Sequence, residues 1–398
     1  MSILILNRNA PYPFKTWLKD VSEELIIFTT SEREKLIESF YVEGFENYEN
    51  NGRVEIQALK LFEEFKYDTV ISTSEFDIIR AARIREYLGI NGQTTKSANA
   101  FRDKIIMKEI LNTKGILVPA FKKLNSSLDA YLFGEKYGFP LIIKPISGSG
   151  SENVYKIKDA SELEIFLQDD KNIQYMEIEE YIDGEMYHVD GLYLDGKLKF
   201  CCASKYINGC LAYQSGDYNG SFLLEHKNPM FIRLLGYAKD ILNSLPTPQN
   251  TAFHLEVFHT RNDDLIFCEI ACRRGGGYIL ESIERAYGIN LVEVSTLYQC
   301  GVNKKIKNIN YSENLDKITG FILIPSKKGE IINLPQTCEF DWVIEQKIFA
   351  SVGDFYDDST GSLDNIAQFL IEGVSEEDVK TKIEIIMEWF ETNTKWKL

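Results

Sequence analysis

The sequence predicts an α/β protein in which a parallel α/β domain precedes lobes built from antiparallel sheets. Strand-like and helix-like patterns alternate over the first hundred residues, and two hairpin patterns follow in the second half of the chain. The length of 398 residues exceeds what one hydrophobic core usually organises. With 44% hydrophobic and 26% charged residues, the composition is that of a globular protein and excludes disordered and fibrous classes.

The charge and cysteine content restrict the partners and the compartment. A net charge of −16 argues against nucleic acid or an anionic membrane as the main partner, although a few lysines still suffice to bind a nucleotide. The N-terminus lacks a signal-peptide pattern, and no apolar run approaches the roughly 18 to 20 residues that span a bilayer. The 7 cysteines form no CxxC pair, which favours reduced thiols over a zinc site. We expect a cytoplasmic protein, with a homodimer as the default assembly.

The first domain, residues 1–97, reads as a parallel sheet flanked by helices. Its expected elements are strands at 2–7, 24–29 and 68–72 and helices at 54–65 and 76–88, the last closed by Gly89. Ligands bind at the carboxyl ends of the strands in such sheets. Residues 7–9 and 73–75, including Glu75, are therefore candidate substrate contacts.

The middle of the chain, residues 98–305, reads as a small α+β lobe at about 119–188 followed by an antiparallel lobe. The elements expected here are helices at 99–113, 128–137, 160–168 and 231–242, a strand at 140–144, strands at 187–194 and 197–203 joined by Asp195-Gly196, and a polar loop at 208–221. After Gly301 a lysine- and asparagine-rich linker leads to a C-terminal α+β unit, residues 306–398, with an amphipathic helix at 379–390.

The most informative segment is a second hairpin pattern at residues 254–277. If its turn at 261–264 is symmetric, Glu256 lies opposite Glu269, and like charges in that position are destabilising. A divalent cation relieves this repulsion, and Mg²⁺ prefers carboxylates together with phosphate oxygens. The period of two places His254 and Arg273 on the same face. The pattern predicts a site for metal-bound phosphate, with a solvated hairpin face as the alternative.

Two glycine-rich segments are candidate anion sites. Arg273 leads through Arg274 into Gly275 and Gly276 and then into a helix at 278–287, whose N-terminal N–H groups can bind a substrate carboxylate. The alternative is a tight connection that needs glycine dihedrals. The loop at 147–151 follows Lys144 at a strand end and can cradle phosphates, although it matches neither a P-loop nor a dinucleotide fingerprint.

Taken in order, these motifs resemble the ATP-grasp superfamily. The motifs are FRDK at 101–104, IIKP at 142–145, SGSGS at 147–151, EEYIDGE at 179–185, HLE at 254–256 and EIACRRGGG at 269–277. The run ISTSEFDIIRAARIREYLGINGQ at 71–93 resembles the domain that precedes it in the carboxylate–amine ligase branch, close to the L-amino acid (dipeptide) ligases. The resemblance covers essentially the whole chain.

The resemblance implies ATP and Mg²⁺ as cofactors, with two metal ions expected and Mn²⁺ as an alternative. It assigns the nucleotide phosphates to Lys104, Lys144 and the loop of Ser147, Gly148, Ser149, Gly150 and Ser151, with Lys205, opposite Met186 across the first hairpin, as a further candidate. It assigns adenine to backbone groups of Glu179, Glu180, Tyr181 and Ile182, metal to Glu256 and Glu269, the acyl-phosphate to Arg273, and the acceptor site to His254.

Two positions depart from the family pattern. The glutamate that often binds ribose is replaced by Met186, and the adjacent Glu185 points to the opposite face of an extended strand. The asparagine that often follows the second metal glutamate is Ala271, which leaves fewer protein ligands for the metal.

The expected activity is ATP-dependent amide formation through an acyl-phosphate, joining L-amino acids into a dipeptide. Alternatives are a ligase with a carrier-bound or sugar-derived amine, a purine-pathway carboxylase-like enzyme that uses bicarbonate, and a nucleotide-binding regulator without catalysis. The intact set of Glu256, Glu269 and Arg273 argues against the regulator. The sequence does not identify the carboxylate and the amine.

Overall fold

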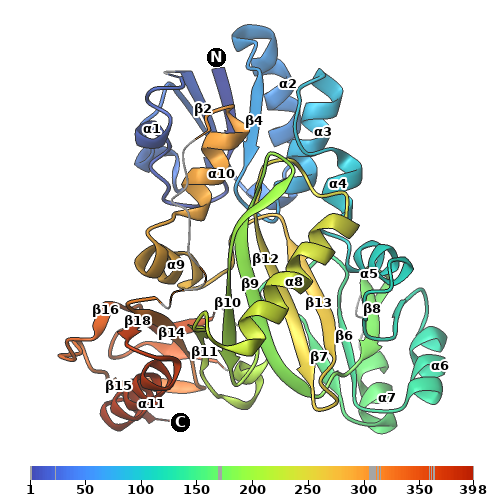
Figure 1. The fold of residues 1–398 in the computed structure, drawn as a ribbon, viewed down its shortest axis with the longest axis vertical. Helices are drawn as coiled ribbons and strands as arrows, with labels where there is room; N and C mark the ends of the chain where they lie inside the picture. The colour runs from blue at the N-terminus through green and yellow to red at the C-terminus, as the bar shows by residue number, and fades with distance from the viewer. Residues whose placement is uncertain are drawn as a thin grey trace.

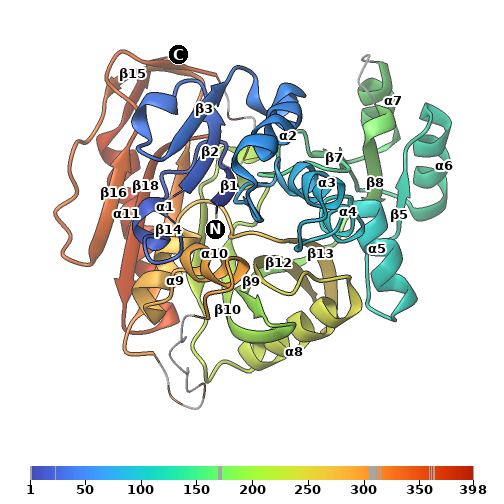
Figure 2. The same cartoon turned by 90° about the horizontal axis from the view of Figure 1, so that it is seen from above.

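The computed structural model describes residues 2–22, 24–168, 173–303, 311, 313, 315–357, 359, 361 and 364–397. Within them the strands form four sheets, arranged as an N-terminal domain, a small lobe, a central sheet and a small C-terminal sheet (Figures 1 and 2). The predicted α/β class is confirmed. No described helix is long and apolar enough to cross a membrane.

The N-terminal sheet is parallel, with the order β3-β2-β1-β4. Its elements are β1 (Ser2–Leu6), α1 (Phe14–Trp17), β2 (Glu24–Thr30), β3 (Tyr41–Phe45), α2 (Arg53–Phe65), β4 (Thr69–Ser72) and α3 (Ile78–Leu88). Leu4 and Ile26 pack in a cluster with residues of α2 and α3, whereas Ile5 and Ile27 pack with residues of α1. Burial on both faces explains why these strands are continuous apolar runs. The sequence did not predict β3, which carries a glutamate and a glycine and is only half-buried.

The small lobe is an antiparallel sheet with the order β5-β8-β6-β7. It contains β5 (Phe121–Lys123), α6 (Ser127–Tyr137), β6 (Leu141–Pro145), β7 (Tyr155–Ile157), α7 (Ala160–Gln168) and β8 (Met176–Glu180). The sheet ends at Glu180, and the next strand begins at Gly184 in the central sheet. The sheet of the small lobe therefore ends before residue 188, where the lobe was expected to end.

The single helix expected at 99–113 is two helices, α4 (Thr95–Ala100) and α5 (Lys104–Thr113). Asp103 breaks the pattern because its carboxylate accepts hydrogen bonds from the backbone N–H groups of Ile105 and Ile106 and caps α5. The break makes Lys104 the first residue of α5. The backbone N–H of Lys104 donates to the carbonyl of Ile146, which directly precedes the glycine-rich loop.

The central sheet has eight strands in the order β13-β12-β9-β10-β11-β14-β18-β16. The elements of this half are β9 (Gly184–Leu194), β10 (Lys197–Ile207), β11 (Asn219–Leu223), α8 (Pro229–Ser244), β12 (Thr251–Thr260), β13 (Leu265–Ala271), α9 (Ile279–Tyr287), α10 (Leu291–Gln299), β14 (Ile318–Pro325), β15 (Gly329–Asn333), β16 (Val343–Ile348), β17 (Phe355–Tyr356), β18 (Asn365–Gly373), α11 (Glu376–Asn393) and β19 (Lys395–Lys397).

One expectation for this region needs correction. The polar stretch at 208–221 is not loop throughout, because β11 begins at Asn219. The C-terminal region adds β14, β18 and β16 to the central sheet, while its described strands β17, β15 and β19 form a sheet of their own. The expected linker falls largely on 304–310, outside the described residues.

Both hairpins form, and bulges set their registers. Asp195 and Gly196 have φ values of 52° and 69°, as a two-residue turn of the favoured type requires. A bulge between Leu198 and Phe200 then places Lys205 opposite Tyr187, so the expected partner Met186 is wrong.

In the second hairpin Glu256 does lie opposite Glu269. The turn itself is not symmetric, since His259 pairs with Leu265. A register shift that leaves Cys268 without a partner restores the predicted pairing.

Candidate active site

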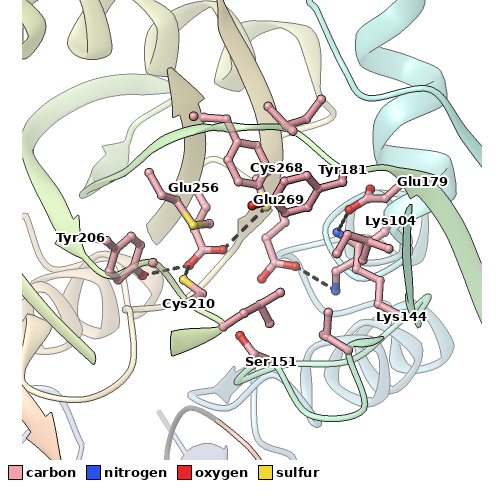
Figure 3. Close-up of a pocket in the computed structure, with 18 of the residues that line it drawn as sticks. Lys104, Lys144, Ser151, Glu179, Tyr181, Tyr206, Cys210, Glu256, Cys268 and Glu269 are labelled. Atoms are coloured by element: carbon pink, nitrogen blue, oxygen red, sulfur yellow. Dashed lines mark hydrogen bonds and ion pairs between the residues drawn. The ribbon is translucent and has the colours of Figure 1, made fainter. Parts of the chain in front are cut away.

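Glu256 and Glu269, here called the acid pair, lie at two adjoining cavities on one side of the central sheet. The first has a volume of about 440 Å³ and the second about 270 Å³. Residues shared by both linings are Ser149, Ser151, Tyr206, Cys210, Glu256 and Glu269. The acid pair therefore lies where the two cavities meet, and Figure 3 shows it among residues that line the first cavity.

The predicted phosphate lysines both line the first cavity. Lys104 Nζ lies 2.9 Å from Glu269 Oε2 and donates a hydrogen bond of 3.2 Å to the Gly148 carbonyl. Lys144 Nζ lies 2.5 Å from Glu179 Oε1. Burial alone would lower the pKa of Lys144, but Glu179 and neighbouring acidic groups raise it well above its usual value. Both side chains thus bring a positive charge into the cavity.

The acid pair is anionic in spite of its burial. Glu256 Oε1 accepts hydrogen bonds of 2.8 Å from the Tyr206 hydroxyl and 3.5 Å from the Cys210 thiol (Figure 3). Burial raises the pKa of Glu256, and the hydrogen bond with His254 helps to bring it below its usual value. Burial also raises the pKa of Glu269, but Lys104 and Lys144 lower it to about 2. Two adjacent carboxylates that stay ionised suit a divalent cation.

The second cavity contains the predicted arginine. Arg273 Nε lies 2.5 Å from Glu75 Oε2, and Arg102 Nη1 lies 2.9 Å from Glu75 Oε1. Arg102 Nη2 also donates to the Ser147 carbonyl at 2.6 Å. Burial lowers the pKa of Arg273, but Glu75 and Glu269 raise it above its usual value. Glu75, expected to contact substrate, therefore holds two arginines and joins the N-terminal domain to the rest of the site.

The predicted acceptor-site histidine belongs to a larger hydrogen-bonded group. His254 Nδ1 lies 2.9 Å from Asp190 Oδ1, and its Nε2 lies 3.5 Å from Glu256 Oε1. Asp190 Oδ2 lies 2.6 Å from His188 Nδ1, whose Nε2 lies 2.6 Å from Ser221 Oγ. Burial lowers the pKa of His254, but Asp190 raises it to about 10. Burial raises the pKa of Asp190, but His254 and His188 outweigh it and hold that pKa well below its usual range.

Sequence reasoning missed Asp190 and His188. Within the described residues these two and His254 are also the one group of three histidine, cysteine or acidic side chains spaced closely enough to hold a metal ion. Both ring nitrogens of His188 already have partners, so we interpret the group as a hydrogen-bonded support for His254. The pairing of β9 with β12 sets Asp190 opposite His254, and because these strands belong to different hairpins, the hairpin patterns in the sequence did not indicate it.

A buried charge cluster at the junction of the two lobes was also missed. Lys108 is fully buried, with its Nζ 2.8 Å from Glu177 Oε1 and also paired with Glu179. The Glu179 side chain thus contacts two lysines, and the residue lines the first cavity together with Glu180, Tyr181 and Ile182. The alternation of Glu177 and Glu179 along β8 places both on one face and was the available signal.

The register turns Lys205 away from the acid pair. Lys205 pairs with Tyr187 of β9, and the next residue of β9, His188, pairs with Glu256. Neighbouring residues of a strand point to opposite faces of the sheet, so the Lys205 side chain leaves the sheet on the face opposite that of Glu256. Lys205 Nζ instead pairs with Glu185, and both residues line the first cavity together with Met186. The next residue, Tyr206, is the one that reaches Glu256. Because Lys205 lines the first cavity, its contact with a phosphate stays a prediction, as does the ribose contact.

Comparison with known proteins gives a consistent result. Residues 137–282 match a family model described as an ATP-grasp domain. The chain is 29% identical over 332 residues to an L-arginine-specific L-amino acid ligase of Bacillus subtilis, covering 80% of this chain and 78% of that protein. It is 22% identical over 316 residues to the alanine–anticapsin ligase of Bacillus subtilis strain 168, covering 73% and 66%.

Solved structures support the same fold. The crystal structure of an L-amino acid ligase from Bacillus licheniformis superposes with a TM-score of 0.77 at 17% identity and covers 100% of this chain and 99% of that one. Residues 137–282 thus match the ATP-grasp domain family, and over most of its length the chain is similar to an L-amino acid ligase in sequence and in fold.

Proposed function

We propose that the protein is an ATP-dependent carboxylate–amine ligase that joins L-amino acids into a dipeptide through an acyl-phosphate, releasing ADP and phosphate. The observation that carries the proposal is the position of the Glu256–Glu269 pair on the common wall of two cavities. One cavity brings lysines and the glycine-rich loop, and the other brings Arg273 and the Gly275–Gly277 turn. Such a junction suits the transfer of a phosphoryl group from a nucleotide to a carboxylate.

The first cavity is the proposed ATP site. Lys104 and Lys144 bind the phosphates as point charges, and the loop at 147–151 covers them with backbone N–H groups. Glu256 and Glu269 fit Mg²⁺, since both are anionic and lie opposite each other. When bound, the metal would supply positive charge that offsets the negative charge of the phosphates. Two ions are expected, with Mn²⁺ as a substitute.

The chemistry proceeds in two displacements. A carboxylate oxygen of the first amino acid attacks the γ-phosphorus, and the bond from phosphorus to the bridging oxygen breaks and releases ADP. The amine of the second amino acid then attacks the acyl carbon, the bond from that carbon to the phosphate oxygen breaks, and the attacking nitrogen loses a proton. Arg273 stabilises charge on the acyl-phosphate, and the small lobe excludes the water that would hydrolyse it.

The function is tested by phosphate release from Mg–ATP with all amino acids, singly and in pairs, and mass spectrometry of the products. We expect release that depends on particular amino acids and a product with the mass of a pair less one water. Glu269→Gln, which keeps the shape of the side chain and removes its charge, serves as the inactive control.

Other outcomes separate the alternatives. Bound ATP with silence across the panel would favour a carrier-bound or sugar-derived amine, whereas release that depends on bicarbonate would favour a carboxylase. A protein that binds ATP but turns over with none of these partners would favour a regulator. Absence of ATP binding would contradict the proposal altogether.

A further inference from the structure

The second cavity contains a polar group that the protein leaves without a partner. Asn219 is 8% exposed and lines this cavity, and its buried Oδ1 has no hydrogen-bond partner among the described residues. A buried acceptor without a donor is costly, and such atoms normally find a partner. Within the proposed function, the natural donor is an N–H group of the substrate.

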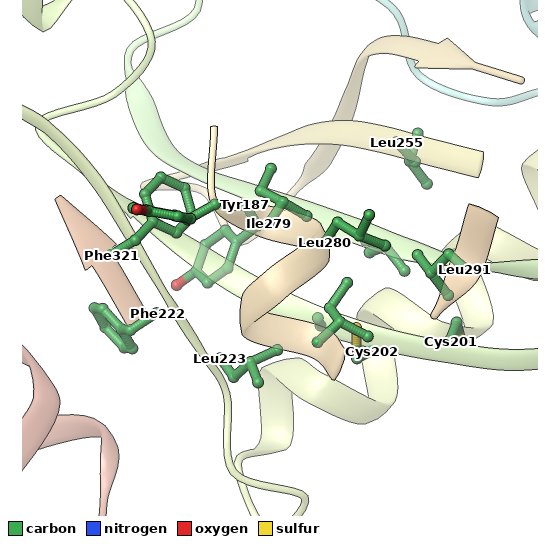
Figure 4. Close-up of a cluster of buried hydrophobic side chains, with 14 of the residues drawn as sticks. Tyr187, Cys201, Cys202, Phe222, Leu223, Leu255, Ile279, Leu280, Leu291 and Phe321 are labelled. Atoms are coloured by element: carbon green, nitrogen blue, oxygen red, sulfur yellow. The ribbon is translucent and has the colours of Figure 1, made fainter. Parts of the chain in front are cut away.

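Three apolar residues of the second cavity belong to the strand and the helix near Asn219. Asn219 pairs with Leu323 on β14, and Ser221 pairs with Phe321 on the same strand. Leu323 and Phe321 line the cavity together with Ile279 of α9, and Figure 4 shows Phe321 and Ile279 within the main buried cluster. This corner of the cavity is therefore suited to an apolar side chain.

The backbone around the corner is closely packed. A Cβ atom added to Gly277 would lie 3.2 Å from Leu323 Cδ1, and one added to Gly220 would lie 2.9 Å from the Phe321 carbonyl oxygen. Glycine at both positions lets β11, β14 and the glycine turn approach each other. The corner is a built feature, formed by three segments far apart in the sequence.

Every carboxylate that lines the described part of the second cavity already has a role. Glu75 is held by Arg102 and Arg273, and Glu256 and Glu269 are the proposed metal ligands. No carboxylate is left there to pair with a lysine or arginine side chain. A buried charge without a partner is strongly disfavoured, so the cavity does not match a basic substrate.

Besides Arg273, two other arginines line the second cavity, Arg8 and Arg274, and both already have partners in the protein. Arg8 pairs with Glu49 and lies 4.5 Å from the centre of the Phe76 ring. Arg274 donates from Nε to the Tyr12 hydroxyl at 2.8 Å and from Nη1 to the Gly275 carbonyl at 2.9 Å. An acidic substrate side chain therefore has no free cation to meet among these residues.

We propose that the second cavity selects an amino acid with an uncharged, apolar side chain, that Asn219 Oδ1 accepts a hydrogen bond from an N–H of this substrate, and that Ile279, Phe321 and Leu323 receive its side chain. The inference rests on the proposed ligase function and adds the substrate class. It differs from the specificity for arginine stated in the name of the Bacillus subtilis relative.

The first test compares amino acids in the phosphate-release assay. Alanine, valine, leucine and methionine should give a kcat/KM at least tenfold above that of arginine, lysine, aspartate and glutamate. A preference for arginine or another charged amino acid would overturn the inference and leave the ligase function standing. Silence with every amino acid would instead count against the ligase function.

The second test examines Asn219 with two variants and one control. Asn219→Ala should raise KM for the preferred amino acid about tenfold, with KM for ATP unchanged, because only the substrate loses a hydrogen bond. Asn219→Asp keeps an acceptor oxygen and should restore most of the affinity. Asn112→Ala, at an exposed asparagine of α5, is the matched control and should change neither constant.

Stability separates a binding role from a structural one. Because Asn219 Oδ1 has no described protein partner, Asn219→Ala should leave the melting temperature unchanged or raise it. A lower melting temperature together with an unchanged KM for the amino acid would show that Asn219 supports the fold, and the assignment would be wrong.

Discussion

Individual carboxylates at the site keep their charge because each has a different kind of partner. Glu269 is stabilised by Lys104, whereas Glu256 is stabilised by His254 and also accepts from the neutral groups of Tyr206 and Cys210. Burial raises the pKa of the Cys210 thiol well above its usual value, so it donates a proton and adds no negative charge. This arrangement lets two like charges face each other across a hairpin until a cation binds.

Arg273 carries the clearest catalytic prediction. Arg273→Ala should lower kcat by about a hundredfold or more, because the acyl-phosphate loses the guanidinium that offsets its charge. Glu75 keeps Arg102 as a partner, so the fold should survive. The measurement is amino acid-dependent phosphate release, with circular dichroism to verify folding and exposed Arg53→Ala as the control. A folded Arg273→Ala protein with full activity would remove the assignment.

The predicted site residues that the structure brings together are those that carry their own local signal. Lys104, Lys144, Glu256, Glu269 and Arg273 all line the two cavities, and motif order and strand alternation had singled them out. Lys108 and Asp190 carry no such signal. The partners of Lys108 lie 69 and 71 residues further along the chain, and those of Asp190 include a histidine 64 residues away. A lone lysine or aspartate reveals such a partner only after the strands are paired.

At the scale of elements, α5 is joined to the sheet of the small lobe by the buried group Lys108, Glu177 and Glu179. Lys108→Met should lower the free energy of unfolding by about 3 kcal/mol, since it leaves two buried carboxylates short of a cation. Urea unfolding measures the change, with exposed Lys114→Met as the control. Equal stability of the two variants would mean that Lys144 alone compensates both carboxylates.

A second link between elements predicts a dependence on pH. Glu372 of β18 accepts from Arg285 Nε of α9 at 2.8 Å and pairs with Lys317, which precedes β14. Burial raises the pKa of Glu372, but Lys317 and Arg285 lower it below its usual value. A depressed pKa in the folded state stabilises the protein above the unfolded pKa of about 4.3, and this contribution is lost as the pH falls through the folded value.

Glu372→Gln should therefore lower the free energy of unfolding by about 1 kcal/mol at pH 7, and the difference from the unmodified protein should shrink toward pH 3. Thermal unfolding at a series of pH values gives the measurement. Glu388→Gln, at an exposed glutamate of α11, should show no such trend. A difference that persists unchanged at pH 3 would contradict the role of the charge.

Helices and strands were predicted well where caps and apolar runs define them, and poorly where bulges or long-range pairing decide. The boundaries of α7 were predicted without error, and Gly89 ends α3 in the left-handed conformation as expected. The bulge between Leu198 and Phe200 leaves no mark in the composition, yet it moves Lys205 to a different partner. One inserted residue in a strand is enough to reassign every contact beyond it.

For the molecule as a whole, the site depends on segments from the entire chain. The second cavity combines the strand ends at Asn7 and Thr73, the glycine turn after β13, and Phe321 of β14. The sequence indicated the strand ends and the turn, but not that the C-terminal strands extend the central sheet. That feature follows from the pairing of β11 with β14, two strands separated by about a hundred residues.

The glycine-rich loop connects three parts of the molecule and should report nucleotide binding. The Ser147 carbonyl accepts from Arg102, the Gly148 carbonyl from Lys104, and the Ser151 carbonyl from the Tyr213 hydroxyl at 2.7 Å. The Val154 carbonyl accepts from Gln214 Nε2 at 2.7 Å. A nucleotide phosphate in the first cavity would accept hydrogen bonds from the N–H groups of the loop and would pair with the charge of Lys104. Both interactions would hold the loop over the ligand.

A non-hydrolysable ATP analogue with Mg²⁺ should therefore slow hydrogen exchange in the loop at 147–154, measured by mass spectrometry. Exchange in α2 of the N-terminal domain, which lines neither cavity, should stay unchanged and serves as the internal control. Glu269→Gln should weaken the protection at a fixed concentration of Mg²⁺, because one of the two carboxylates that would hold the metal loses its charge. Unchanged exchange in the loop at saturating analogue would mean that the phosphates lie elsewhere, and Lys104 and the loop would then have no common ligand.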